Sequence, residues 1–401
     1  MDPSSILPYE TFSAICVEFA FDIVQSERRA FTIWKSLTGV SRAWRSIARQ
    51  TPDLWTVLCP VRHRRLSPTI HFAEQSVLAR NRPLHVIWPD VPHAFEDSAP
   101  AVAALAEQLH HLQYTSTMRA LSRQSLGTLP HVTTVDISMW EPASMDALRA
   151  LRDTPALQSL TLTLVSEPDM WDRTLDPVSF FVPKVPHLTC LILHASAQLV
   201  FHAQTCMDLL SASKETLVCV AVTGDIFWPL GMSPSAQITL ELGALQVLTL
   251  SHTAARLIYA IRTPNAQDIE VRQVDWPTLG NAALATCLGS NSEALTYLHF
   301  THVGAVASAT VRDALAVLEP CTSVETLVLD FSEALPSKVR FGRLIMRALI
   351  DYDALPSLKN LYVWLGSRWR YEDIDLLHEL QQKISPPNTR NVAIHSDQHC
   401  G

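Results

Sequence analysis

Few residues of this 401-residue chain have the types and spacing that chemistry needs. Ser211-Ala212-Ser213-Lys214 has the Ser-x-x-Lys spacing of a serine nucleophile beside a lysine, but no Ser-Asp-Asn or Lys-Thr-Gly follows it. Chance explains this match better. His299 and His302 lack the acidic neighbour of a His-Glu-x-x-His zinc site, and a strand would point them to opposite faces. We expect these two, and the pair His110-His111, to be surface or capping histidines.

The cysteines also lack the spacing of a metal or disulfide site. There are eight of them, and none forms a Cys-x-x-Cys pair. Several lie in apolar runs, as Cys190 does, so we expect small residues that are buried or half-buried. The sequence also has no Gly-rich phosphate loop and no Walker lysine motif. It therefore predicts no catalytic residue, no metal and no cofactor, and a protein that is not an enzyme.

Composition limits the partners and the location. The net charge of −8 argues against nucleic acid, whose binders normally carry a basic face. The dense basic cluster Arg62-His63-Arg64-Arg65 fits a nuclear-import or phosphate patch, or, as we prefer, a solvated loop. No apolar run reaches the ~18 residues of a membrane span, and the first residues lack the features of a signal peptide. We expect a cytoplasmic or nuclear protein without a membrane partner.

A hexapeptide of the form apolar-x-x-apolar-x-apolar fills most of the chain. It occurs nine times from Val132/Val135/Ile137 to Leu358/Leu361/Val363, with a mean step of about 28 residues, as in leucine-rich repeats. Many copies open with a proline turn signal, such as Leu129-Pro130-His131. We predict an α/β fold with an irregular leucine-rich-repeat solenoid over residues 127–401. An ordinary α/β domain with a parallel sheet is the alternative.

Within each hexapeptide the first, fourth and sixth residues should face the core, because strand side chains alternate. The residues between and just after them should form an exposed, concave binding face for an unknown protein target. The candidate residues are Asp136, His194, Thr223, Asp268, Glu270, Arg272, Tyr297, His299, Asp330, Tyr362 and Trp364. The aromatic members are the expected anchors, since aromatic residues dominate interface hot spots. Alternatively, each is merely a solvated strand position.

Two further segments flank the repeats. Residues 61–126 are a transitional segment, with a helix expected at 70–80, a strand at 83–89 and a second helix at about 99–111. At the other end, 371–380 reads as an amphipathic helix and 391–394 as a last strand. Together these two elements should cap the stacked core.

The first 60 residues are a separate helical module. We expect a helix at 6–24, a loop at about 22–32, a second helix at about 30–50 and a short element from Asp53. A module of this size buries little surface and is marginal without a partner. Its signature stretches are Leu7-Pro8-Tyr9-Glu10, the run from Val40 to Ala48, and Thr51-Pro52-Asp53-Leu54-Trp55.

These stretches resemble an F-box, in the form common in fungal proteins. The chain departs from that pattern at Ser41, where Cys is frequent, at Thr11-Phe12, and in the long loop at 22–32. The resemblance implies docking to an SKP-type adaptor, and through it to a cullin, by the first two helices. The residues implied as the contact or its support are Leu7, Pro8, Glu10, Ile15, Val40, Trp44, Leu54 and Trp55. A helical cap for the repeats is the alternative interpretation.

The resemblance, joined to a repeat array, implies a substrate-recognition subunit of an SCF-type (cullin–RING) ubiquitin ligase. Such a subunit catalyses nothing and acts by holding a target protein near the conjugating enzyme. A non-catalytic scaffold that works outside ubiquitin transfer is the alternative. An enzyme is a third possibility, for which the sequence offers no site.

Overall fold

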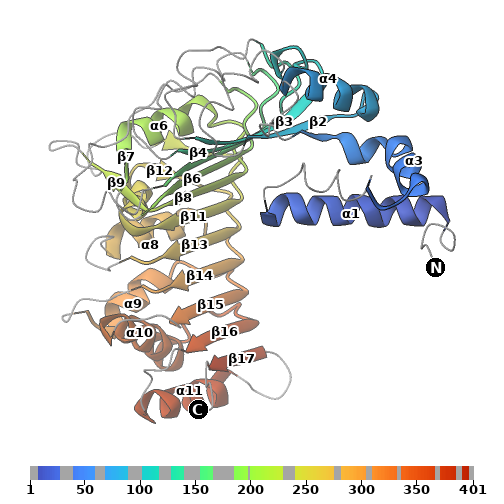
Figure 1. Cartoon of the computed structure of the whole chain (residues 1–401). Helices are drawn as coiled ribbons and strands as arrows, with labels where there is room; N and C mark the ends of the chain where they lie inside the picture. The colour runs from blue at the N-terminus through green and yellow to red at the C-terminus, as the bar shows by residue number, and fades with distance from the viewer. Residues whose placement is uncertain are drawn as a thin grey trace. The chain divides into compact units, whose positions relative to one another are not determined.

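A computed structural model describes most of the chain (Figure 1). The described residues are 8–27, 39–58, 68–88, 102–116, 128–139, 154–165, 185–196, 199–228, 240–274, 281–303, 309–331, 336–365, 371–384 and 391–396. Contacts within the chain define two compact units, unit 1 over Met1–Leu188 and unit 2 over Thr189–Gly401. The boundaries predicted at 60 and 126 remain a prediction.

Unit 1 begins with helices. They are α1 (Tyr9–Glu27), α3 (Arg42–Gln50), the 3₁₀ helix η2 (Pro52–Trp55) and α4 (Pro68–Ala79). Ser41 precedes α3 and caps it, because its hydroxyl accepts a hydrogen bond from the backbone N–H of Trp44 at 3.2 Å. The predicted loop at 22–32 starts too early, since α1 continues to Glu27. Residues 19–27 contain no glycine or proline to stop the helix, and residues 28–32 lie outside the described part of the chain.

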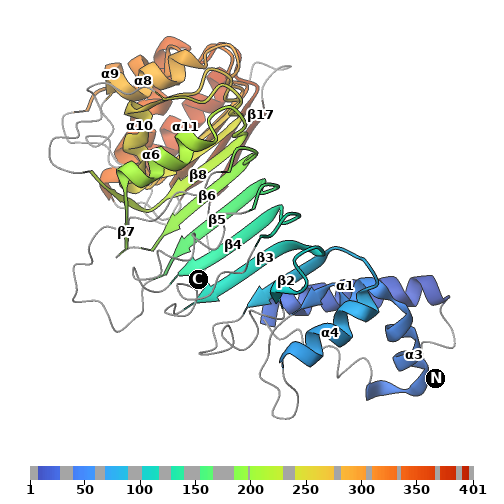
Figure 2. The same ribbon diagram turned by 90° about the horizontal axis from the view of Figure 1, so that it is seen from above.

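The strands of unit 1 form a parallel sheet in chain order (Figure 2). They are β1 (Val57–Leu58), β2 (Leu84–Trp88), β3 (Leu109–Ser116), β4 (Thr134–Met139) and β5 (Ser159–Leu164). The strand predicted at 83–89 and the helix at 70–80 are confirmed as β2 and α4. The helix predicted at 99–111 runs too far: Val102 and Ala103 are helical, but residues 104–108 form a turn and β3 begins at Leu109. Leu109 and Leu112 follow the hexapeptide pattern, and pairing with β2 and β4 overrides the local helical preference.

Unit 2 continues the same pattern of parallel strands. In sheet order these are β6 (Cys190–Ala195), β8 (Cys219–Thr223), β11 (Val247–Ser251), β13 (Asp268–Arg272), β14 (Tyr297–Thr301), β15 (Thr326–Phe331), β16 (Asn360–Leu365) and β17 (Asn391–Ser396). The helical connections are α6 (Ala203–Ala212), the 3₁₀ helix η5 (His252–Tyr259), α8 (Asn281–Ser290), α9 (Val311–Leu318), α10 (Pro336–Tyr352) and α11 (Tyr371–Ile384). Two short pairs, β7 (Val200–His202) with β9 (Asp225–Phe227) and β10 (Leu240–Glu241) with β12 (Ile261–Arg262), lie outside this sheet.

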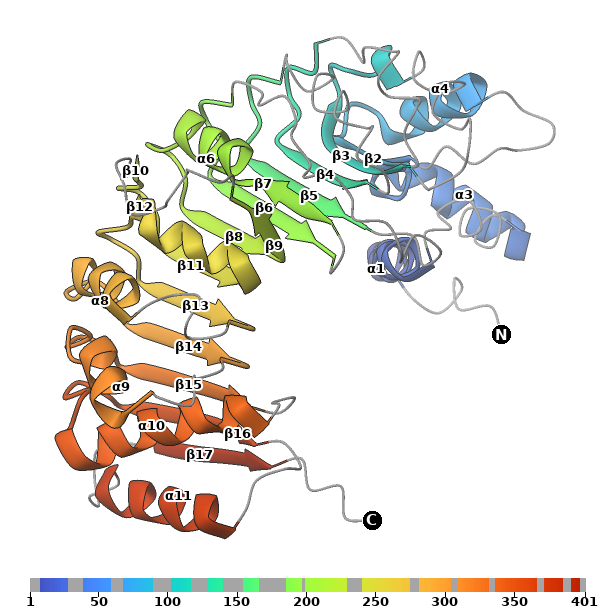
Figure 3. The same cartoon turned by 90° about the vertical axis from the view of Figure 1, so that its left-hand side faces the viewer.

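Helices cover one face of the sheet in unit 2. Figure 3 shows α8, α9 and α10 on one side of β13–β16, and none of the described helices of this unit covers the opposite side. The helix predicted at 371–380 and the strand predicted at 391–394 are confirmed as α11 and β17, which pack on α10 and pair with β16, respectively. Their role as a cap stays a prediction. None of the described helices is both long enough and apolar enough to cross a membrane.

Every copy of the hexapeptide carries one of the strands β4, β5, β6, β8, β11, β13, β14, β15 and β16. Its first, fourth and sixth residues are buried, as Leu295, Leu298 and Phe300 illustrate at β14. This confirms the predicted alternation and makes the fold a repeat-built α/β array with a parallel sheet. The six described cysteines also fit the prediction: four are buried, Cys190 and Cys219 are half-buried, and none of the six is in a disulfide.

A tight turn sets the start of most strands. In the turn before β4, the N–H of Val132 donates to the carbonyl of Leu129 at 3.4 Å, and in the turn before β16 the N–H of Leu358 donates to the carbonyl of Leu355 at 3.1 Å. The same bond closes the turns that begin at Thr154, Val185 and Thr263. In all five turns the second residue is proline, whose fixed φ suits this position of a β-turn. The proline signals therefore mark the turns that precede five of the strands.

Candidate interaction site

The uncovered side of β13–β16 presents an ordered grid of side chains. We call these residues the open face. They are Asp268, Glu270 and Arg272 of β13, Tyr297, His299 and Thr301 of β14, Thr326, Val328 and Asp330 of β15, and Asn360, Tyr362 and Trp364 of β16. The strands pair without a register shift, so equivalent positions line up in rows. One row reads Glu270, His299, Val328, Tyr362, and the next reads Arg272, Thr301, Asp330, Trp364.

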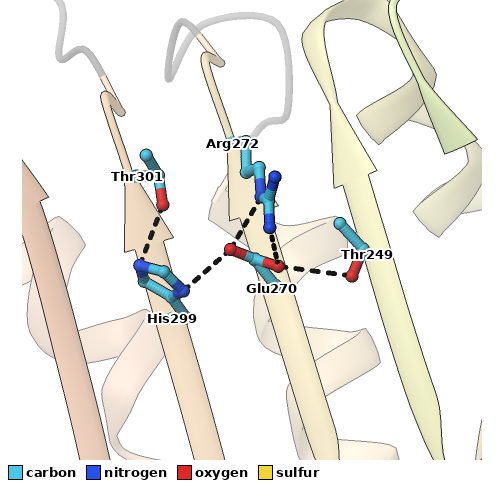
Figure 4. A network of polar contacts seen from close by, with 5 residues as sticks. All are labelled: Thr249, Glu270, Arg272, His299 and Thr301. Atoms are coloured by element: carbon cyan, nitrogen blue, oxygen red, sulfur yellow. Dashed lines mark hydrogen bonds and ion pairs between the residues drawn. The ribbon is translucent and has the colours of Figure 1, made fainter. Parts of the chain in front are cut away.

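Glu270 is the centre of a polar network on the open face (Figure 4). Its Oε1 lies 2.7 Å from Nε of Arg272 and 2.8 Å from Nδ1 of His299. Its Oε2 accepts hydrogen bonds from Nη2 of Arg272 at 2.7 Å and from the hydroxyl of Thr249 at 3.3 Å. The other ring nitrogen of His299 lies 2.9 Å from the hydroxyl of Thr301. One carboxylate therefore links β11, β13 and β14.

The network keeps Glu270 ionised. Burial by itself would raise the pKa of Glu270, but hydrogen bonds from His299 and Arg272 outweigh it and lower the pKa to about 2. The hydrogen bond to Glu270 in turn raises the pKa of Arg272. A group with so low a pKa is poorly matched to proton transfer near neutral pH. The arrangement can fix side chains and present charge, which are properties of a binding surface.

The far end of the open face is aromatic and acidic. Tyr362 and Trp364 are 36% and 41% exposed, which is high for side chains of their size, whereas Val328 beside Tyr362 is buried. Asp330 pairs in register with Trp364. The ring of Tyr297 meets that of His299 edge-on, with the centroids 6.2 Å apart. Exposed aromatic side chains on a fixed scaffold are typical anchors of protein interfaces.

The structure divides the predicted binding residues between the two units. Arg272, Tyr297, His299, Asp330, Tyr362 and Trp364 all lie on the open face. His194 is exposed on β6, where its Nδ1 lies 2.6 Å from the hydroxyl of Thr223 on β8. Asp136 belongs to unit 1, on the solvent-facing side of β4.

Asp136 belongs to a histidine cluster that the sequence prediction missed. Its Oδ2 lies 3.1 Å from Nε2 of His111 on β3, and the rings of His111 and His85 have centroids 3.7 Å apart. His85 on β2 is directly opposite His111 in register. Side chains alternate along the strand predicted at 83–89, which places His85 on the same side of the sheet as Asp136. The sequence could therefore have predicted that the two lie on one face.

Electrostatics sets the protonation of this cluster. Burial, and to a smaller extent the neighbouring His111, lower the pKa of His85 to about 4, while Asp136 opposes the shift. Burial acts to raise the pKa of Asp136, but hydrogen bonds from His111 and Thr161 outweigh burial, so the net shift is downward. His85 is therefore neutral at pH 7, and its buried Nε2 has no hydrogen-bond partner among the described residues.

The residues implied for adaptor docking fall into two groups. Pro8 and Glu10 are exposed, and so are Ile15 at 52% and Val40 at 59%. Leu54 and Trp55 are instead buried inside the module, and Trp44 is half-buried with its ring against Phe12 at a centroid distance of 4.6 Å. Leu7 lies outside the described residues.

Thr51 and Trp55 close the module from within. The indole N–H of Trp55 donates to the carbonyl of Ala48 at 2.7 Å. The hydroxyl of the buried Thr51 donates to the carbonyl of Ile47 at 2.9 Å, and it also lies 2.9 Å from the hydroxyl of Ser13 on α1. Thr51 and Trp55 therefore tie α1, α3 and η2 together, which is a supporting role.

The remaining chemical candidates do not assemble a site. Ser211 and Lys214 are exposed at the end of α6, and Lys214 contacts Glu215 at 3.4 Å. His302 is buried, so the prediction of a surface residue is wrong for it, and the chain leaves β14 there with a φ of 52°. Within the described ranges no three His, Cys, Asp or Glu side chains are grouped so that they could hold a metal ion.

Comparisons with known proteins add little. No protein-family model matches the chain, and no curated protein matches it. A solved structure, the leucine-rich repeat-containing protein LegL7 from Legionella pneumophila, aligns with 85% of this chain and 91% of that one. The TM-score is 0.34 and the identity 12%. A likeness this distant carries nothing about binding or activity.

Proposed function

We propose that this protein is the substrate-recognition subunit of an SCF-type (cullin–RING) ubiquitin ligase. Residues 1–60 form an F-box-like module that docks on an SKP-type adaptor, and the repeats hold a target protein. The chain supplies proximity: it converts the encounter between target lysines and the conjugating enzyme into an effectively intramolecular event.

One observation carries the adaptor part of the proposal. The module buries its closing residues Leu54 and Trp55, yet leaves Ile15 and Val40 more than half exposed. Covering the exposed half of such an aliphatic side chain in an interface is worth roughly 1–1.5 kcal/mol, half of what full burial gives. Val40 falls within a stretch that resembles an F-box, and Ile15 lies on the first helix, which the resemblance implies in adaptor docking.

Point variants in the full chain test the adaptor contact. Ile15→Glu and Val40→Glu should each abolish capture of a purified SKP-type adaptor in a pulldown, because a charge would face an apolar interface. Val77→Glu is the matched control, since Val77 of α4 is 74% exposed and lies outside the module of residues 1–60. Val77→Glu should capture the adaptor normally.

A deletion provides the decisive comparison. A chain without residues 1–60 should lose the adaptor completely, and equal capture by the deleted and intact chains would refute the F-box assignment. Co-purification of the intact chain with both adaptor and cullin supports a ligase. Adaptor without cullin favours the scaffold that acts outside ubiquitin transfer.

A further inference from the structure

We propose that the open face binds a lysine- or arginine-bearing segment of the target protein, with the cationic side chain held between Asp330 and Trp364. This inference rests on the proposed recognition function and specifies the chemistry of the partner. It assigns the anchor to the β15–β16 end of the face.

The positions of three residues carry the proposal. Asp330 and Trp364 are opposite each other on adjacent parallel strands, and paired strands lie about 4.8 Å apart. Tyr362 is on the same strand as Trp364, two residues earlier, so both rings project from the same side of the sheet. An ammonium or guanidinium group at this place meets a carboxylate and the face of an indole, the ring that attracts cations most strongly.

The charge of the open face has the sign that this partner needs. The face holds three carboxylates, Asp268, Glu270 and Asp330, and one guanidinium, Arg272. Arg272 makes two contacts of 2.7 Å with Glu270, and the charge of Asp330 also contributes to raising its pKa. With three carboxylates against one guanidinium, the excess charge of the face is negative. The pKa of Tyr297 reflects this surrounding: burial raises it, and the carboxylates of Glu270 and Asp268 raise it further. A phosphate backbone or an acidic peptide would be repelled.

The length of a row sets the size of the partner segment that the open face can hold. From β13 to β16 a row crosses three strand intervals, about 14 Å. An extended chain covers this distance with four or five residues at ~3.3 Å each. A cationic residue bound at Asp330 and Trp364 therefore leaves three or four residues of the partner to lie over Thr301 and Arg272.

A peptide-binding measurement on the full chain tests the inference. The probe is a fluorescent ten-residue peptide of Gly and Ser with a central Lys-Ser-Arg, compared with peptides carrying norleucine and citrulline, or two Glu, at the same places. Fluorescence polarisation should show the cationic peptide binding at least about tenfold more tightly than the neutral one. Binding should weaken as salt is raised, because exposed charges are screened.

Variants locate the bound peptide. Asp330→Asn and Trp364→Ala should each weaken the cationic peptide about tenfold, and Asp330→Lys should reverse the preference toward the Glu peptide. Asp208→Asn, which removes an exposed carboxylate from α6, is the matched control and should change nothing. Circular dichroism and thermal unfolding of each variant check that the fold is retained.

Three outcomes would overturn the inference: no binding of the cationic peptide, equal binding of the neutral peptide, or unchanged affinity in both Asp330→Asn and Trp364→Ala. Adaptor capture by the same samples separates the two proposals. If Asp330→Asn and the parent chain both capture the adaptor but the peptide does not bind, the cationic-partner inference fails alone. If the adaptor is not captured by the parent chain, the ligase proposal fails.

Discussion

Glu270 shows how much one half-buried charge can organise on the surface of a sheet. Its two oxygens contact Thr249, Arg272 and His299, which stand on three neighbouring strands. Because each contact is made to the ionised form, loss of the charge would affect all three strands at once. Glu270 thus makes this part of the open face rigid, which favours binding by lowering the entropy lost when a partner is held.

Lowering the pH should act first on His85. Its pKa is about 4 in the folded protein and near 6.5 in an unfolded chain, so the unfolded state binds more protons between these values. Stability should therefore fall as the pH drops from about 6.5 to 4, by roughly 2–3 kcal/mol. Urea unfolding across this range measures the effect, and His85→Gln should flatten the pH dependence.

Glu270 makes stability depend on pH in a second, more acidic range than His85 does. Its folded pKa of about 2 is below the unfolded value of 4.5, so its contribution is present above pH 4.5 and lost as the pH falls toward 2. Glu270→Gln should leave the slope between pH 6.5 and 4.5 unchanged. An unaltered slope in His85→Gln would show that His85 is not the group responsible.

At the scale of single residues, the sequence predicted which side of the sheet a side chain occupies but not which side chains it contacts. Alternation within the hexapeptide places His299 and Arg272 on the solvent side, and the structure agrees. That both contact Glu270 depends on rotamers and on the register of β13 with β14, which no single hexapeptide encodes. The burial of Leu54 and Trp55 was equally invisible, because a motif match does not distinguish a residue that contacts a partner from one that supports it.

Gly224 ends β8 at a position that no other residue fits. Its φ is +104°, a Cβ added there would lie 2.4 Å from the carbonyl oxygen of Ala195, and its N–H donates to the hydroxyl of Ser251 at 2.9 Å. Gly224→Ala should lower the free energy of unfolding by about 2–4 kcal/mol, from backbone strain and the clash. Thermal or urea unfolding gives the value.

Gly243 provides the control for this substitution. A Cβ there would meet nothing within 4 Å, and no positive φ is recorded for it. Gly243→Ala should therefore change stability by less than about 1 kcal/mol. Equal effects of the two substitutions would mean that the close approach of Gly224 to Ala195 does not exist.

Strands were easier to predict than the segments that join them. Nine hexapeptides and five turn prolines located the strands of the repeats, because burial and φ restriction act within a few residues. The connection from β11 to β13 became the 3₁₀ helix η5, and residues 104–111 of the helix expected at 99–111 became a turn and the start of β3. These outcomes depend on the space left by neighbouring repeats, which acts over distances that a local pattern does not cover.

At the scale of the whole molecule, the last elements should be needed for solubility. In α11, Leu376, Leu377 and Leu380 are buried, Glu379 contacts Arg347 of α10 at 2.9 Å, and β17 pairs along β16. A chain ending at Leu365 exposes the edge of β16 and the flank of α10. Such edges recruit other chains, so the truncated protein should self-associate.

Size-exclusion chromatography with light scattering measures that association. The control is a chain that lacks residues 397–401 and keeps α11 and β17, and it should elute as the parent does. A truncated chain with the same mass and elution as the control would show that α11 and β17 are dispensable as a cap.

The rows of the open face affect how the binding specificity of such a protein can evolve. Each strand interleaves two sets of positions, one packed against the helices and one presented to solvent, and each row joins equivalent positions from four repeats. A substitution at Tyr362 or Asp330 alters what is recognised while the buried residues stay in place. A single inserted residue within a strand would exchange the two sets and destroy both. Selection can therefore retune the surface by point substitution, whereas insertions are tolerated only in the connections.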